Sequence, residues 1–148
     1  MKSPRRVVIT GLGVVSPIGI GKASFWANLL AGKSGVDYVS TFDAASYPCR
    51  VAAELHGFDI SKFMAPKAAK KLSRCSQLSV AAARLALEDA GLGIALVSGA
   101  HRVGVCFGTS VSGIADIGES NHRAFLAKSI SDLNPIAMLE FPAHAATS

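Results

Sequence analysis

The pattern of apolar positions predicts two strands that are buried in a sheet. Residues 5–10 form a β-branched run that leads into Gly11, and residues 102–108 form a second apolar run that ends in glycine. Continuous apolar runs bounded by glycine are typical of parallel strands covered on both faces. Residues 50–55 are compatible with a third, short strand, and residues 33–50 are expected to form a loop.

Two helices are predicted between these runs. Residues 22–31 carry apolar side chains at helical spacing, and Gly32 suits the left-handed position just past the helix end. The longer helix covers residues 66–91, with Pro66 at its start and Gly91 after its end. Its second half carries a wide apolar face and is expected to be well buried. The order of strands and helices indicates an α/β fold with a parallel sheet and right-handed crossovers.

The composition supports one folded domain. The chain has 148 residues, of which 50% are hydrophobic and 7% aromatic, so apolar material for a core is present and much of it is small. Small residues let helices and strands approach closely, as they do in layered α/β folds. Fifteen basic and ten acidic residues give a net charge of +5, which modestly favours acidic partners.

The cysteines and the N-terminus bear on location. Cys49, Cys75 and Cys106 form no CxxC pair, so neither disulfides nor a zinc site is predicted, and a reducing cytoplasm is expected. Cys106 lies inside an apolar run and is expected to pack in the core. The basic residues before the first run resemble a signal peptide, but glycines and Pro17 interrupt the stretch that follows. No segment approaches the ~18 apolar residues that span a bilayer.

The glycines after the first run raise the question of a nucleotide site. A G-x-G-x-x-G fingerprint needs glycine or alanine at the position of its third glycine and a helix that begins inside the motif. The chain has Gly11 and Gly13 but Ser16 in the third position, followed by Pro17 and Gly19. Because proline costs about 3 kcal/mol inside a helix, we expect the glycines to serve a sharp turn and close packing, and no cofactor is predicted. A nucleotide-binding oxidoreductase domain stays open as the less favoured alternative.

Four stretches carry a family resemblance, in order along the chain. They are RVVITGLGVVSPIG at 6–19, Trp26 with LLAGKSGV at 29–36, Phe42-Asp43 with Tyr47, and RVGVCFGTSVSG at 102–113. Each resembles a segment in the N-terminal half of the β-ketoacyl-[acyl-carrier-protein] synthases. These are the elongating condensing enzymes of fatty-acid and polyketide synthesis.

The resemblance implies a thiolase-like fold of two α/β halves, layered αβαβα. Residues 1–148 would cover most of the first half, as an N-terminal domain that is truncated at its C-terminal end. The implied reaction is the decarboxylative Claisen condensation of an acyl thioester with malonyl-carrier, in an enzyme that is usually a homodimer. The family's catalytic cysteine and two histidines correspond to positions beyond Ser148. No catalytic residue is therefore assigned, and the chain alone is expected to be inactive.

Basic side chains cluster in a stretch that contains no acidic residue. They are Lys62, Lys67, Lys70, Lys71 and Arg74. On a continuous helix the last four would share one face, although positive charge near a helix N-terminus opposes the helix dipole. The resemblance implies that the acidic acyl carrier protein docks here, at positions of which the last three lysines match the family's. A plain solvated face stays an open alternative, and the lack of interleaved aromatic residues argues against nucleic acid.

The turn over residues 108–113 supplies the remaining site candidate. The resemblance implies that Val111 lines the acyl-chain pocket, although Ser110 and Ser112 depart from the family's glycine-rich pattern, and ordinary packing is an equal alternative. No metal is predicted, because the histidines show no ligand spacing; they are His56, His101, His122 and His144. A non-catalytic docking or dimerisation partner of an active synthase is the main functional alternative.

Overall fold

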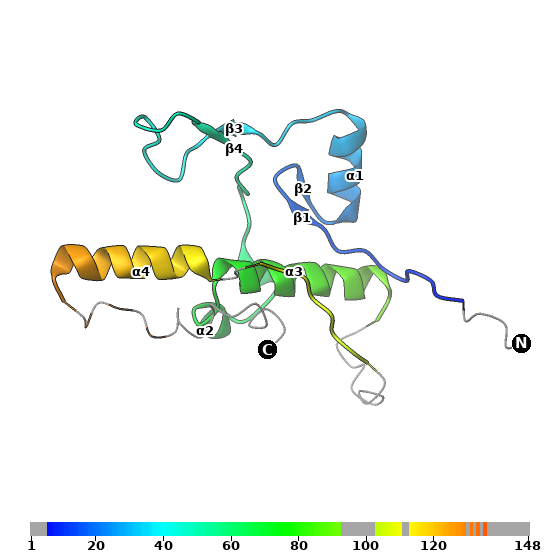
Figure 1. The fold of residues 1–148 in the computed structure, drawn as a ribbon. Helices are drawn as coiled ribbons and strands as arrows, with labels where there is room; N and C mark the ends of the chain where they lie inside the picture. Colours follow the sequence, from blue (N-terminus) through cyan, green and yellow to red (C-terminus); the bar gives the residue numbers. More distant parts are fainter. Residues whose placement is uncertain are drawn as a thin grey trace, which may run out of the picture. The chain divides into compact units, whose positions relative to one another are not determined.

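The chain falls into two compact units, and Figure 1 shows its helices and strands in chain order. The computed structural model describes residues 6–92, 103–110 and 113–129, together with 131, 133 and 135. Unit 1 contains Met1–Phe58 and Ala82–Leu96, and unit 2 contains Asp59–Ala81 and Val97–Ser148. The described elements are β1 (Val15–Ser16), β2 (Gly19–Ile20), α1 (Lys22–Leu30), β3 (Asp37–Tyr38), β4 (Val51–Ala52), η1 (Ile60–Lys62), α2 (Pro66–Ala69), α3 (Arg74–Asp89) and α4 (Ile114–Ala127). The helix α3 therefore begins in unit 2 and ends in unit 1.

Unit 1 contains two short antiparallel ribbons. In the first, Val15 of β1 lies opposite Ile20 of β2, and in the second, Tyr38 of β3 lies opposite Val51 of β4. The strand predicted at 50–55 is thus present in part, as β4. Its partner β3 lies inside the segment that was expected to be a loop, because two-residue pairings leave no periodic signal in the sequence.

Helix α1 confirms the helix predicted over residues 22–31, since it runs from Lys22 to Leu30. Its end is closed as expected: Gly32 has a φ of 65°, and the Lys33 N–H donates to the Asn28 carbonyl at 2.9 Å. The Asn28 side chain also donates to the Ile18 carbonyl, which ties α1 to the turn between β1 and β2.

The two glycines of the Gly-Leu-Gly sequence lie against the C-terminal half of α3, inside unit 1. A Cβ atom at Gly13 would overlap the Ala82 carbonyl oxygen and lie 2.6 Å from the Ala86 nitrogen. A Cβ atom at Gly11 would overlap the Ala86 carbonyl oxygen in the same way. The predicted close packing is confirmed, because only glycine lets the backbone approach this helix so closely.

The same corner is a poor place for a phosphate. The Leu12 N–H donates to Asp89 Oδ2 at 2.9 Å, and Lys22 forms an ion pair with the same carboxylate. The Lys22 and Leu12 hydrogen bonds hold the pKa of Asp89 below its ordinary value. An anion here would therefore meet a carboxylate at the C-terminal, negative end of a helix dipole.

The predicted parallel sheet is not present among the described residues. Residues 6–10 and 103–108 form no strand, and their apolar side chains are exposed, with Val7 at 91%, Ile9 at 82% and Val105 at 76%. The two sheets in this part of the chain are the antiparallel ribbons of unit 1. Strands of a parallel sheet need partners at their edges and cover on both faces, and neither is present here.

The long helix predicted over residues 66–91 is instead two helices. Pro66 begins α2 as predicted, but α2 ends at Ala69, and α3 starts only at Arg74. The predicted end is confirmed, since Gly91 has a φ of 66° just after α3. The expected burial of the second half is not observed: between residues 82 and 91 every side chain is half-buried or exposed.

Little of the described chain is buried. The buried hydrophobic residues in this part are Ala44, Ala69 and Ala81, and no large side chain in it is fully enclosed. Within the described ranges, no helix combines the length and the hydropathy needed to cross a membrane.

Candidate functional site

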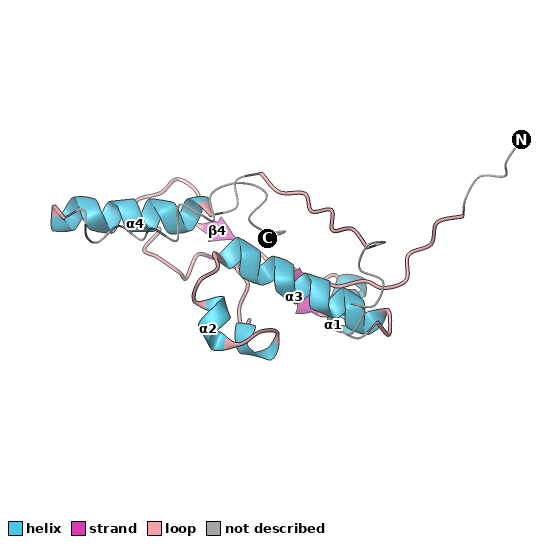
Figure 2. Cartoon of the chain, turned by 90° about the horizontal axis from the view of Figure 1, so that it is seen from below, coloured by secondary structure: helices cyan, strands magenta, loops and turns pink. Residues whose placement is uncertain are grey.

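The basic side chains predicted as a docking site lie where α2 meets α3, in unit 2. They are Lys67 within α2, Lys70 at its C-cap, Lys71 in the following turn and Arg74 at the start of α3, and all four are exposed. The prediction that they share one face of a continuous helix is wrong, because the helix is broken between them (Figure 2). We call these four residues the basic elbow.

Hydrogen bonds hold the two arms of the basic elbow together. Gln77 Nε2 donates to the carbonyls of Ala69 at 3.0 Å and Leu72 at 3.1 Å, so one side chain satisfies backbone groups left over where α2 ends. Ser73 Oγ accepts the N–H of Ser76 at 3.2 Å and acts as the N-cap of α3. Ala69, Ser73 and Ser76 are buried. The bend is therefore stabilised by hydrogen bonds and by buried residues on its inner side, while its cationic side chains are exposed to solvent.

The three lysines of the basic elbow lie in a stretch that is poor in negative charge. The sequence contains no acidic residue between Asp59 and Glu88. Within the described ranges, no ion pair involves Lys67, Lys70 or Lys71. The first turn of α3 also lacks an acidic residue, so the positive end of its dipole adds to the field of the lysines. A surface of this kind attracts an anionic partner.

The acidic residue nearest to the elbow in sequence, Asp59, caps the short helix η1. Its Oδ1 accepts the Ser61 hydroxyl at 2.7 Å and the Ser61 N–H at 2.9 Å. These two bonds, with the charge of Lys62 as a smaller cause, hold the pKa of Asp59 below its ordinary value. Its negative charge is thus kept at neutral pH but is tied to the turn before α2.

The cysteines do not form a catalytic arrangement in the described part of the chain. Cys106 is exposed, so the expectation that it packs in a core is wrong, because its segment forms no strand there. Cys75 is half-buried, and its sulfur lies 4.0 Å from the Thr109 hydroxyl. Cys49 is exposed. Within the described ranges, no cysteine hydrogen-bonds to a histidine that could activate it.

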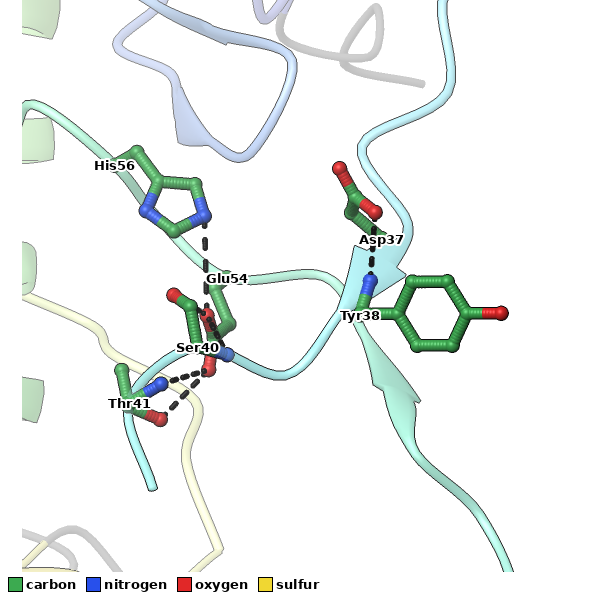
Figure 3. Close-up of polar contacts among 6 residues, drawn as sticks. All are labelled: Asp37, Tyr38, Ser40, Thr41, Glu54 and His56. Carbon is green, nitrogen blue, oxygen red and sulfur yellow. Dashed lines mark hydrogen bonds and ion pairs between the residues drawn. The ribbon is translucent and has the colours of Figure 1, made fainter. Parts of the chain in front are cut away.

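A carboxylate clamp in unit 1 was missed by sequence reasoning (Figure 3). One Glu54 oxygen accepts the Ser40 N–H at 3.0 Å and the Ser40 hydroxyl at 2.6 Å, and the other accepts the corresponding groups of Thr41 at 3.2 and 2.6 Å. The Ser40 and Thr41 hydroxyls lower the pKa of Glu54 to about 2. His56 Nε2 lies 3.8 Å from the same carboxylate. A Ser-Thr pair thirteen residues before a glutamate follows no known spacing rule, so no sequence signal indicated the clamp.

The other predicted candidates are not drawn together. His122 is exposed on α4, and Ser110 is exposed. Val111, Ser112, His101 and His144 lie outside the described residues. Among the residues that are described, no group of histidine, cysteine and acidic side chains could hold a metal ion. The basic elbow is therefore the candidate that geometry and charge support best, as a docking surface.

Comparison with known proteins identifies the class. Residues 4–147 match the family described as "Beta-ketoacyl synthase, N-terminal domain". Because this match covers nearly the whole sequence, the chain belongs to the β-ketoacyl synthase family. The resemblance stated from the four sequence stretches is confirmed.

Individual relatives narrow the comparison. The chain is 44% identical over 131 residues to 3-oxoacyl-[acyl-carrier-protein] synthase 2 of Coxiella burnetii (strain RSA 493 / Nine Mile phase I), covering 88% of this chain and 31% of that protein. The fold of this chain matches the ishigamide ketosynthase/chain length factor with a TM-score of 0.76 and 29% identity, over 96% of this chain and 35% of the other. A chain in the structure of a type II polyketide synthase acyl-carrier protein in complex with its ketosynthase also has a similar fold. The TM-score is 0.70 and the identity 22%, over 94% of this chain and 37% of that chain.

These matches place the chain in one part of a larger fold. It spans about a third of the length of the relatives that it matches. The ketosynthase N-terminal fold is thus shown by structural likeness, whereas the sheet predicted from the sequence is not formed in the described residues.

Proposed function

We propose that the chain contributes the N-terminal part of an elongating β-ketoacyl-[acyl-carrier-protein] synthase, and that its basic elbow docks the carrier protein. The observation that carries the proposal is the exposed cluster of four cations at the bend between α2 and α3, whose three lysines form no ion pair with the described residues. An acidic carrier would deliver the acyl and malonyl thioesters that the condensing reaction joins. The elbow's part in that reaction is to bind and orient the carrier.

The relatives support this assignment. The Coxiella protein is by name a synthase acting with acyl carrier protein. A related fold is a type II polyketide ketosynthase in complex with its acyl-carrier protein. Electrostatic complementarity raises association rates and fixes orientation more than it raises affinity, which suits a carrier that must be released after each transfer.

We assign the condensation reaction to the family's catalytic cysteine and two histidines, which correspond to positions beyond Ser148. In the described part of the chain no cysteine is bonded to a histidine, and an unactivated thiol is a weak nucleophile. We therefore expect the purified 148-residue chain to bind carrier protein without forming a ketoacyl product. The reading as a non-catalytic docking partner and the reading as one part of a synthase predict the same binding surface.

Charge reversal tests the proposal. The double variant Lys70→Glu, Lys71→Glu should weaken binding of a bacterial acyl carrier protein roughly tenfold at low ionic strength, because two exposed attractions become repulsions. The loss should shrink as salt is raised toward physiological strength, where the screening length is about 8 Å. Titration followed by fluorescence anisotropy of a labelled carrier measures both effects.

A matched control keeps the net charge equal. Lys33→Glu with Lys128→Glu changes the charge by the same amount at two exposed positions that do not belong to the elbow. This control should bind carrier nearly as the unaltered chain does. If both double variants lose affinity equally, only the overall charge matters, and the basic elbow is not the docking surface.

A further inference from the structure

One side chain holds the backbone on both sides of the two adjacent lysines of the basic elbow. Gln77 of α3 donates through Nε2 to the Ala69 carbonyl at 3.0 Å and to the Leu72 carbonyl at 3.1 Å. Ala69 directly precedes Lys70, and Leu72 directly follows Lys71. The segment that carries both lysines is therefore tied at each end to the same amide group of α3.

The backbone bonds that the two lysines make themselves are local. The Lys70 N–H donates to the Pro66 carbonyl at 3.1 Å, and the Lys71 N–H donates to the Ala68 carbonyl at 3.0 Å. These bonds keep the segment helical but do not set its direction relative to α3. Because α2 has only four residues, and an isolated helix shorter than about 12 residues is marginal in water, the segment depends on its bonds to α3.

The amide of Gln77 suits this position because it donates hydrogen bonds without carrying a charge. A carboxylate of the same shape has no donor at neutral pH and would present oxygen atoms to two carbonyl oxygens. It would also place a negative charge in residues 60–87, which contain none. Gln77 is half-buried and its partner Ala69 is buried. The link is thus strong in geometry and neutral in charge.

We propose that Gln77 is a positioning residue for carrier docking, because it fixes the direction in which Lys70 and Lys71 leave the bend. The inference rests on the proposed function, since it concerns the same surface. Exposed charges steer a partner before contact and act mainly on the association rate. Groups that are already ordered lose less freedom on binding, so their order stabilises the formed complex. The lysines therefore govern association, and Gln77 governs dissociation.

Gln77→Met tests the inference on the 148-residue chain. It removes both hydrogen bonds but keeps the net charge, the approximate length of the side chain and a good helix former. The dissociation rate constant of a labelled bacterial acyl carrier protein should rise about fivefold, while the association rate constant stays within about twofold. Stopped-flow fluorescence anisotropy at low ionic strength measures both. Loss of folded protein would lower the bound amplitude without changing the dissociation rate constant, so a merely structural role gives a different result.

Ser79→Ala is the matched control. Ser79 Oγ donates to the Cys75 carbonyl at 2.8 Å, and both residues belong to α3. The variant therefore also removes a side-chain hydrogen bond to the backbone of this helix, but it leaves the link to α2 intact. Both rate constants should stay within about twofold of those of the unaltered chain. Urea unfolding of each variant reports the folded fraction.

Gln77→Asn decides the question if Gln77→Met does not fold. Its amide is one methylene shorter and is drawn back from both carbonyls, so the carrier should again dissociate faster than from the unaltered chain. The inference is overturned if the folded Gln77 variant releases the carrier at the unaltered rate, or if Ser79→Ala accelerates release equally. Lys70→Glu with Lys71→Glu should lower the association rate constant instead. If that double variant binds normally, the proposed function fails; if it binds weakly while the Gln77 variants release the carrier normally, this inference alone fails.

Discussion

The basic elbow of unit 2 and the N-terminal segment of unit 1 (residues 6–11) are both rich in exposed side chains, but they differ in their backbone hydrogen bonds. In the elbow, Gln77 and Ser73 hydrogen-bond to the backbone at the bend, and the four cationic side chains are exposed. In residues 6–11 the backbone forms no hydrogen bond to another described residue, and Val7, Val8 and Ile9 are exposed. Local hydrogen bonds therefore hold the elbow, whereas the described residues offer the N-terminal segment no comparable hydrogen bonds.

The largest effect is expected where the N-terminal segment meets α3. Gly13→Val would place a branched side chain into the Ala82 carbonyl, and helix backbone cannot move aside as a flexible side chain can. We expect a loss of about 3 kcal/mol or more in the free energy of unfolding, the upper range for overpacking. Urea unfolding followed by circular dichroism measures it.

Gly104→Ala is the matched control for this substitution. Nothing lies within 4 Å of a Cβ atom at that position, so its effect should stay within about 0.5 kcal/mol. If Gly13→Val proves as harmless as the control, the contact with α3 does not anchor the segment, and the contrast between the two regions loses its starting point.

A smaller effect is expected in the basic elbow. Ser73→Ala removes the N-cap of α3 and should lower the free energy of unfolding by about 1 kcal/mol. Because the cap also fixes the bend that carries the lysines, carrier binding should weaken in parallel. Thermal unfolding and anisotropy titration of the same samples check both. Ser46→Ala, at an exposed turn in unit 1, is the control; equal losses in the two variants would mean that the cap does not set the elbow geometry.

The comparison also shows how far sequence reasoning reached. Helix ends marked by Pro66, Gly32 and Gly91 were predictable, because each depends on the conformational preference of one residue. The break between α2 and α3 was not, because the capping of Ser73 and the side-chain bonds of Gln77 compete with a helix that the apolar periodicity alone favours. The role of these residues as a docking site stays a prediction, and their predicted arrangement on a single helix face is wrong.

The sheet failed for a different physical reason. Residues 5–10 and 102–108 have the composition of buried strands, and that composition describes the environment in which a strand is stable. It does not supply the neighbours. The apolar pattern shows which environment a segment favours, so it predicted strands that do not pair among the described residues.

The smallest effect is expected at the Glu54 clamp. Titration of this clamp tests whether unit 1 has stable internal hydrogen bonds outside its N-terminal segment. The pKa of Glu54 is lowered from 4.5 to about 2 by the Ser40 and Thr41 hydroxyls. A carboxyl whose folded-state pKa is depressed stabilises the fold above its unfolded pKa, and that contribution is lost as pH falls through the folded value. The clamp should therefore be intact at pH 7 and should weaken between about pH 4.5 and pH 2.

The amide resonances of Ser40 and Thr41 should titrate together with a midpoint near the pKa of Glu54, and in Glu54→Gln they should not move. Amides of residues 6–11 should show no such transition in either protein. A midpoint near 4.5 for Ser40 and Thr41 would mean that the clamp is open in solution. Unit 1 would then lack these hydrogen bonds as well as those missing from its N-terminal segment.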